Sequence, residues 1–224
     1  MGTELKQTVN RGNIKGVLSE KDLKYFKDSN GNIAGIKGSI IVDSAVGQHK
    51  LQVYSSAKTL NGKANKMYDN ILALKNDYVA AIDATDDKPA NYVSANFSLR
   101  TNDSPNDQGK VVTYLGMSLN TINRISETEA NVEDDDTNMI GLTVIYNKMT
   151  ALPEKDRDNE GDKNLEVFAV NYKGELMPFN LFVSADVVDD VEELYSKGDT
   201  IEITVVPKKI HVAGREKKKA AFGK

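Results

Sequence analysis

Apolar and polar residues alternate with a period of two over most of the first half of the chain. The segment Ile14–Leu18 shows this pattern, and Asn30-Gly31 after it predicts a tight turn. The stretches IKGSIIV (36–42) and HKLQVYS (49–55) continue it, with Leu51 and Val53 on one side of the second. The opposite side of that stretch carries Lys50, Gln52 and Tyr54. We therefore expect three consecutive half-buried strands.

The period changes to that of a helix and then returns to two. In NGKANKMYDNILALKNDYVAAI, apolar side chains recur at helical spacing, at Met67, Ile71, Leu74 and Tyr78. The following stretches form a hairpin, with one apolar face made by Val93, Ala95, Phe97 and Leu99 and by Leu115, Met117 and Leu119. The order β-β-β-α-β-β is that of the OB fold, a five-stranded barrel with a helix. The pattern therefore predicts a mainly β protein that begins with an OB-like barrel.

A second unit repeats most of this order. An acidic stretch with almost no bulky apolar residue, 126–138, reads as a linker. Strand-like segments follow at MIGLTVIYNKM, LEVFAVNY and LMPFNLFVSA. Next come a helix with a stripe of Val187, Val191 and Leu194 that stops at Gly198, and a strand in IEITVVPKKIHV. The order β-β-β-α-β lacks the last strand of the first unit.

These patterns divide the chain into an OB-like domain (1–125), an acidic linker (126–138) and a second, incomplete OB-like domain with a basic tail (139–224). The tail offers little for a fifth strand. Three alternatives remain: the second barrel stays open, a partner completes it, or the chain stops early.

Charge separates the same regions. Residues 1–125 carry 16 Lys and Arg against 12 Asp and Glu, a balance of +4, whereas residues 126–206 carry 6 against 20, a balance of −14. The tail 207–224 has a balance of +6, so the net charge of −4 hides the asymmetry. A basic first half and an acidic middle suggest different roles, although on charge alone ordinary solvated surfaces are the better explanation.

The residues for catalysis or metal binding are sparse. The chain has no Cys, which excludes disulfides, thiol catalysis and Cys-based zinc sites. Its two histidines, His49 and His211, lie in strand-like contexts, where surface positions are commoner than catalytic ones. Asp156, Asp158, Glu160 and Gly161 imitate the start of a calcium loop, but Val167 stands at position twelve, where a Glu is required. Glu133–Asp136 reads as a solvated linker, so we expect no enzyme, no metal and no cofactor.

Nucleic-acid binding remains as the best-supported chemistry. Single strands are held by basic grooves that follow the phosphates and by aromatic rings on which bases stack. The OB barrel presents its second and third strands, and the loops after its first and fourth strands, to such ligands. The candidate residues lie on these elements, in the segment that follows the third strand and on the return strand of the hairpin; they are Lys37, Lys50, Tyr54, Lys58, Lys63, Lys66, Arg100, Lys110, Tyr114 and Arg124. Taken singly, each residue is better explained by a solvated or packed surface, whereas together they slightly favour binding.

The hairpin also resembles a segment of phage-encoded single-stranded DNA-binding proteins with tandem OB-like units. The likeness is carried by a short strand at Phe97–Leu99, a polar loop with Asn102-Asp103 and Gln108-Gly109, and a strand that ends in Thr121–Arg124. The strands GIKGSIIV and NYKGELMPFNLFV and the junction LYSKGDTIEI add to it. Proteins of this type often end in acidic residues that recruit partners, whereas this sequence ends in REKKKAAFGK.

The resemblance implies a non-enzymatic protein of phage replication or recombination in the host bacterial cytoplasm, with single-stranded DNA as its ligand and little sequence preference. Replication or recombination proteins and further copies of the chain are its implied partners. No apolar run approaches the roughly 20 residues that span a bilayer, and no signal peptide is expected at MGTELKQTVNRGN. The alternative is a phage structural or adaptor protein that binds a protein partner through its acidic second unit.

Overall fold

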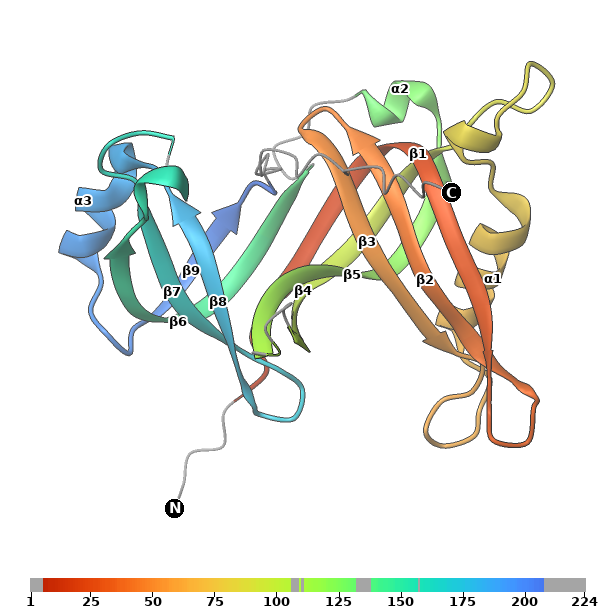
Figure 1. Cartoon of the computed structure of the whole chain (residues 1–224), viewed down its shortest axis with the longest axis horizontal. Helices are drawn as coiled ribbons and strands as arrows, with labels where there is room; N and C mark the ends of the chain where they lie inside the picture. Colours follow the sequence, from red (N-terminus) through yellow and green to blue (C-terminus); the bar gives the residue numbers. More distant parts are fainter. Residues whose placement is uncertain (1–5, 106–108, 110, 132–137, 157, 208–224) are drawn as a thin grey trace, which may run out of the picture.

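The computed structural model describes residues 6–105, 109, 111–131, 138–156 and 158–207. The first part contains strands β1 (Asn10–Lys27), β2 (Ile33–Ser44), β3 (Gly47–Ser56), β4 (Tyr92–Pro105) and β5 (Val111–Ile125), with helix α1 (Lys66–Asp77) and the short helices η1 (Ala81–Asp83) and α2 (Glu127–Ala130). The second part contains β6 (Met139–Ala151), η2 (Glu154–Asp156), β7 (Lys163–Val170), β8 (Leu176–Val183), α3 (Ala185–Leu194) and β9 (Thr200–Val205). Figure 1 shows the two parts side by side.

Strands β1 to β5 close into a barrel. β1 pairs antiparallel with both β2 and β4, β2 pairs with β3, and β4 pairs with β5. A parallel contact between β3 and β5, at Leu51–Met117 and Gln52–Ser118, completes the ring. The helix lies between β3 and β4 in the chain, so the predicted OB-like barrel is confirmed.

Close packing inside the barrel depends on alternation and on glycines in β1 and β2. The apolar sides of β3 and β4 are buried, and Phe97 is 0 % exposed. A Cβ atom on Gly12 would lie 2.4 Å from Cζ of Phe97, so only glycine leaves room for that ring. Gly38 has φ +148°, and its Cα lies against the carbonyl of Asp22, where a Cβ would be 1.9 Å from the oxygen. Without a Cβ atom, Gly12 thus leaves room for Phe97, and Gly38 lets β2 approach β1 closely.

The predicted helix covers one end of the barrel. Ile71 and Leu74 are 0 % exposed, as their helical spacing predicts. Asn65 caps the helix, because its side-chain Oδ1 accepts a hydrogen bond from the Met67 N–H at 3.1 Å. α1 ends at Asp77, so the predicted fourth apolar position, Tyr78, is its C-cap residue.

The second part has the predicted order β-β-β-α-β. Its sheet runs β9-β6-β7-β8, and α3 lies between β8 and β9 in the chain. The predicted apolar stripe on this helix is partly wrong. Val188 is buried and Val191 packs against the core, whereas Val187 and Leu194 are 46 % and 69 % exposed. The helix begins at Ala185, and Val188 is its buried residue.

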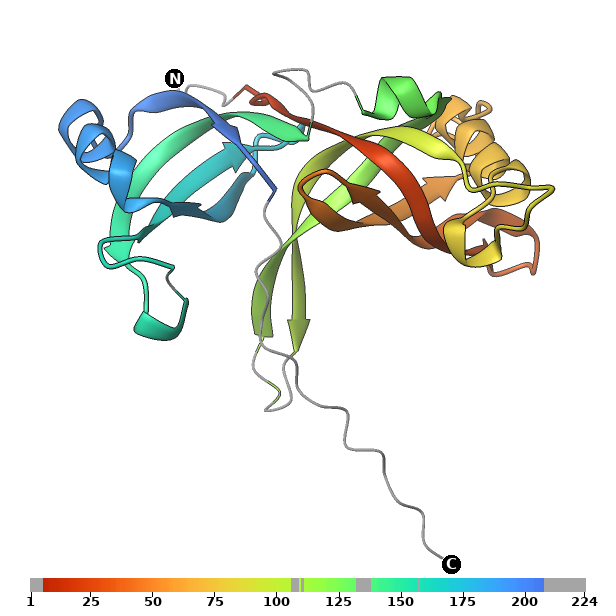
Figure 2. The ribbon, with the colours of Figure 1, turned by 90° about the horizontal axis from the view of Figure 1, so that it is seen from above.

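β1 joins the two parts into one nine-stranded sheet. Its first residues pair antiparallel with β6, from Asn10–Leu142 to Asn13–Met139 (Figure 2). The N–H of Thr8 also donates to the carbonyl of Val170 at 3.1 Å. The first strands of both parts therefore pair with each other, which an acidic linker alone does not predict. The division at 126–138 stays a prediction, and residues 132–137 lie outside the described ones.

Candidate nucleic-acid interface

The outer side of β2 and β3 carries the polar residues that the alternation predicts. On β3, His49, Leu51 and Val53 are buried. Lys50, Gln52 and Tyr54 are exposed between them, and Tyr54 is 60 % exposed. Across the ladder, Lys37 pairs with Tyr54 and Ser39 pairs with Gln52. Directly opposed residues of an antiparallel pair share one side, so these four side chains form one surface.

The β4–β5 hairpin extends this surface. Arg100 pairs with Gly116, and Asn102 pairs with Tyr114, which is 52 % exposed. A Cβ on Gly116 would lie 2.8 Å from Nδ2 of Asn102 and 3.9 Å from Nε2 of Gln52. Hairpin and β3 therefore meet at Gly116, on the same side of the sheet.

We call this surface the polar face. Its members come from β2, β3, β4 and β5, and they are Lys37, Ser39, Lys50, Gln52, Tyr54, Arg100, Asn102, Tyr114 and Gly116. Five of the ten sequence-predicted residues are among them.

Three further predicted lysines lie beyond the end of β3 that carries Tyr54. Lys58 and Lys63 are exposed in the loop that follows β3, and Lys66 is the first residue of α1. The N–H of Ala57 donates to the carbonyl of Ala34 at 2.8 Å, which holds the start of this loop beside β2. The loop therefore continues from the Tyr54 end of the polar face.

Arg124 lies elsewhere. Asn96 pairs with Thr121 but Phe97 pairs with Leu119, so β5 has one extra residue between them. This bulge reverses the alternation that relates Tyr114 to Arg124. The guanidinium of Arg124 donates to the carbonyl of Asp77 and lies 4.4 Å from the centre of the Tyr78 ring. Arg124 thus stabilises the C-terminal end of α1, and a role in binding DNA stays a prediction for it; Lys110 lies outside the described residues.

Two cationic side chains, Arg124 and Lys21, donate to backbone carbonyls at this helix end. Lys21 Nζ donates to the carbonyls of Lys75 (2.9 Å), Leu74 and Tyr78. Cations near the C-terminus of a helix interact favourably with its dipole. Burial lowers the pKa of Lys21 from its ordinary value, against an opposing effect from Asp83.

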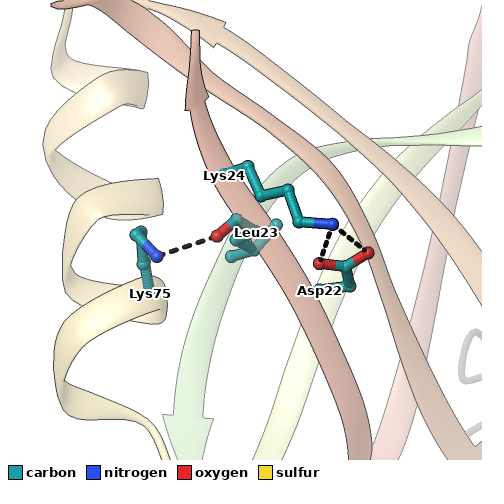
Figure 3. A network of polar contacts seen from close by, with 4 residues as sticks. All are labelled: Asp22, Leu23, Lys24 and Lys75. Carbon is teal, nitrogen blue, oxygen red and sulfur yellow. Dashed lines mark hydrogen bonds and ion pairs between the residues drawn. The ribbon is translucent and has the colours of Figure 1, made fainter.

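Sequence reasoning missed two residues of β1 beside the polar face. The ring of Phe26 stacks on that of Tyr54, with centroids 5.1 Å apart and planes 15° from parallel. Lys24 pairs in register with Lys37 and forms an ion pair with Asp22 at 3.1 Å. Figure 3 shows Lys24 and Asp22 on one side of β1, while Lys75 of α1 reaches the carbonyl of Leu23 from the other. The signal was KYFK (24–27), a basic and aromatic run at the end of β1, two residues before Asn30-Gly31.

The histidine and metal-site candidates have structural explanations. His49 was expected at the surface but is 3 % exposed, because it shares the inward side with Leu51. Its Nε2 lies 3.0 Å from Oγ of Ser44. In the loop that resembles a calcium site, the buried carboxylate of Asp162 accepts hydrogen bonds from the backbone N–H groups of Asp158 and Asn159. No group of three or more His, Asp or Glu within the described ranges could hold a metal ion; His211 and Glu133–Asp136 lie outside them.

Part of the acidic charge of the second part lies on one helix. Helix α3 carries Asp186, Asp189, Asp190, Glu192 and Glu193, and has no basic residue in its last turn. Lys163 of β7 pairs with Glu192 at 2.6 Å. None of the helices in the described part of the chain is long and apolar enough to cross a membrane.

A solved structure shares this fold at low sequence identity. The wild-type single-stranded DNA-binding protein from Thermus aquaticus superposes with a TM-score of 0.53 at 11% identity, over 88% of this chain and 84% of that one. A deletion variant of the same protein gives 0.49 at 10% identity, over 88% and 85%. A search of curated proteins finds no match. A sequence model described as YorF matches residues 8–224, nearly the whole length, and on that match the chain belongs to the YorF family.

Proposed function

We propose that this chain is a non-enzymatic protein that binds single-stranded DNA along the polar face, with little sequence preference. The observation that carries the proposal is the meeting of β3 and the β4–β5 hairpin at Gly116, which places Tyr54 and Tyr114 on one exposed surface with Lys50 and Arg100. Exposed aromatic rings and cations on the ligand side of an OB barrel are what an unpaired strand requires.

Each kind of side chain on the polar face has a task in this proposal. Lys37, Lys50 and Arg100 neutralise phosphates, and the loop lysines Lys58, Lys63 and Lys66 extend that path beyond β3. Tyr54 and Tyr114 stack with bases. Gln52 and Asn102 have amide groups that donate to and accept from base or sugar atoms. Stacking and charge tolerate any base, so sequence preference is weak.

Two likenesses support the proposal from outside the site. The Thermus aquaticus protein that shares the fold is named for binding single-stranded DNA. The hairpin motif resembles phage-encoded proteins of that class, from which we propose a role in phage replication or recombination in the bacterial cytoplasm.

Titration of fluorescent oligo-dT by anisotropy tests the proposal. We expect a dissociation constant below about 10 µM at low salt, tighter than the weak end of non-specific binding. The logarithm of affinity should fall with the logarithm of salt by about 0.7 per neutralised phosphate. Absence of binding at 10 µM protein, or binding that salt leaves unchanged, would overturn the proposal.

A second candidate function rests on α3. This helix exposes Val187 and Leu194 among five carboxylates, a surface suited to a basic protein partner with apolar residues. As a structural or adaptor protein, the chain would co-purify with such a partner and would not bind oligo-dT. The same titration therefore separates the two candidates.

A further inference from the structure

The Phe26 ring packs against the backbone of a neighbouring strand. A Cβ on Gly35 would lie 2.5 Å from two atoms of this ring, and Gly35 is opposite Phe26 in the β1–β2 ladder. The ring therefore lies against the bare backbone of Gly35 on one side. Tyr54 stacks on it nearly parallel, at 5.1 Å between centroids. Phe26 is half-buried, and Tyr54 remains 60 % exposed.

Cations flank this ring pair. Lys24, Lys37 and Tyr54 lie opposite one another in neighbouring strands, so the two ammonium groups and the exposed ring share one row. Lys24 pairs with Asp22, but both side chains are at least 70% exposed. Exposed ion pairs are weak, so a phosphate can replace Asp22 as the partner of Lys24.

We propose that Phe26 and Tyr54 form one pre-assembled stacking platform, in which Phe26 is a positioning residue that fixes the Tyr54 ring for a base. The base stacks on the side of Tyr54 away from Phe26, and Lys24 and Lys37 bind the adjacent phosphates. This inference rests on the proposed function, and it extends the path of the strand from β3 across β2 onto β1. Fixing the ring before binding removes an entropy cost that a free side chain would pay on binding.

A double-mutant cycle on the full chain tests the coupling of the two rings. Tyr54→Leu should weaken oligo-dT binding by about 10-fold, within the range for one stacked base. Phe26→Leu should weaken it by about 3-fold to 5-fold when Tyr54 is present, because an immobilised side chain contributes in this range. In the Tyr54→Leu background, Phe26→Leu should change the affinity by less than about 2-fold, since coupled residues are not additive.

An abasic oligonucleotide of the same length separates positioning from a general structural role. Such a ligand keeps the phosphates but has no base to stack, so Phe26→Leu should leave its affinity unchanged. Phe26→Tyr keeps a ring on Gly35 and should restore oligo-dT binding. Tyr25→Leu is the matched control: Tyr25 is the neighbouring aromatic residue, and Lys75 of α1 lies 5.2 Å from its ring.

The outcomes distinguish this inference from the proposed function. If Phe26→Leu and Tyr54→Leu act independently, or if Phe26→Leu weakens both ligands equally, the platform is refuted while single-stranded DNA binding stands. If the unmodified chain does not bind oligo-dT, the proposed function itself fails. Thermal unfolding of each variant identifies those that have lost the fold. If Phe26→Leu is one of them, the oligo-dT affinity of Phe26→Tyr decides whether Phe26 positions Tyr54.

Discussion

The two parts of this protein share the strand order β-β-β-α-β, but in the described residues only the first part has a fifth strand. In the first, β5 follows β4 and pairs with β3, which closes the barrel and leaves a long hairpin beyond it. In the second, the described chain ends with β9, which pairs with β6, and β8 pairs with β7. The fifth strand thus supplies both closure and the hairpin that carries Arg100 and Tyr114. The β4–β5 hairpin, which this fifth strand completes, supplies four of the nine residues of the polar face.

Their outer surfaces differ as much as their closure. On the second part, Lys148 pairs with Glu166 at 3.4 Å, and Asn164 bonds to Asn180 at 3.3 Å across the β7–β8 ladder. The barrel instead places several cations and two exposed tyrosines on its corresponding side. A shared fold does not imply a shared function, because function depends on the side chains at the site.

The largest expected effect concerns whether the two parts fold together. Phe97→Ala and Phe179→Ala should each lower the free energy of unfolding by about 3–5 kcal/mol, because both rings are fully buried. We expect one cooperative transition in denaturant that both variants shift, since β1 pairs with β4 and β6 alike. Circular dichroism during urea unfolding measures this transition and its midpoint. Two separate transitions, each moved by one variant, would show two independent domains.

The next-largest expected effect concerns which of the two parts binds oligo-dT. Tyr54→Ala combined with Tyr114→Ala should weaken oligo-dT binding by about 30-fold or more, because two stacked bases contribute roughly 1–3 kcal/mol each. The matched control is Tyr172→Ala with Phe182→Ala, which removes two exposed rings of the second part, 75 % and 40 % exposed. Anisotropy should detect less than about 2-fold change in this control. An equal loss in both double variants would assign DNA binding to both parts.

Two aspartates that organise loops provide a smaller test. The Asp162 carboxylate is 3 % exposed and accepts backbone N–H bonds, including that of Ala185 at the start of α3 (3.0 Å). Asp162→Ala should cost about 1–3 kcal/mol in unfolding free energy, because buried donors lose their acceptor. Asp28, exposed in the β1–β2 turn, accepts from the N–H groups of Asn30 and Asn32, both at 2.9 Å. Asp28→Ala should therefore cost less.

The pH dependence of the Asp28 effect has a definite sign. The backbone hydrogen bond from Asn32 lowers the pKa of Asp28 below 3.8. A carboxyl group whose pKa is lower in the folded state than in the unfolded state stabilises the folded state at pH values above its unfolded-state pKa. That contribution is lost as the pH falls through the folded-state pKa. The difference between the wild-type chain and Asp28→Ala should thus be present at neutral pH and shrink below pH 3.8. A difference that grows on acidification would contradict this origin.

How far the sequence predicts these features depends on how local they are. Alternation was sufficient for Lys50, Gln52 and Tyr54, because a strand buried on one side has a strict period of two. Alternation alone does not give the side on which Arg124 lies, since one bulge residue near Asn120 reverses the sides and leaves no local signal. Whether Arg124 binds DNA stays a prediction.

Features that join distant segments were not predictable from local patterns. Phe26 meets Tyr54 only because β2 lies between them and has Gly35 at the right place. The pairing of β1 with β6 likewise depends on tertiary packing. On α3, Val188 packs in the core and Val187 is exposed, so a stripe that begins at Val187 instead of Val188 was the wrong choice.

The smallest expected effect tests whether the acidic part competes with DNA. α3 lies at the opposite end of the molecule from β2 and β3 (Figure 1), whereas charges are screened beyond about 10 Å at 0.1 M salt. Changing Asp186, Asp189 and Asp190 together to Asn should therefore raise oligo-dT affinity by less than about 2-fold at 0.1 M salt.

The same triple variant should have a larger effect at 0.01 M salt, where the screening length is about 30 Å. Asp22→Asn is the matched comparison, because this single carboxylate lies beside Lys24 at the polar face. It should raise the affinity at 0.1 M salt at least as much as the triple change does. If the α3 variant instead binds many times more tightly at 0.1 M salt, then the acidic helix reaches the DNA-binding surface in solution. The second part would in that case act as a competitor for the strand, and the separation of roles between the two parts would fail.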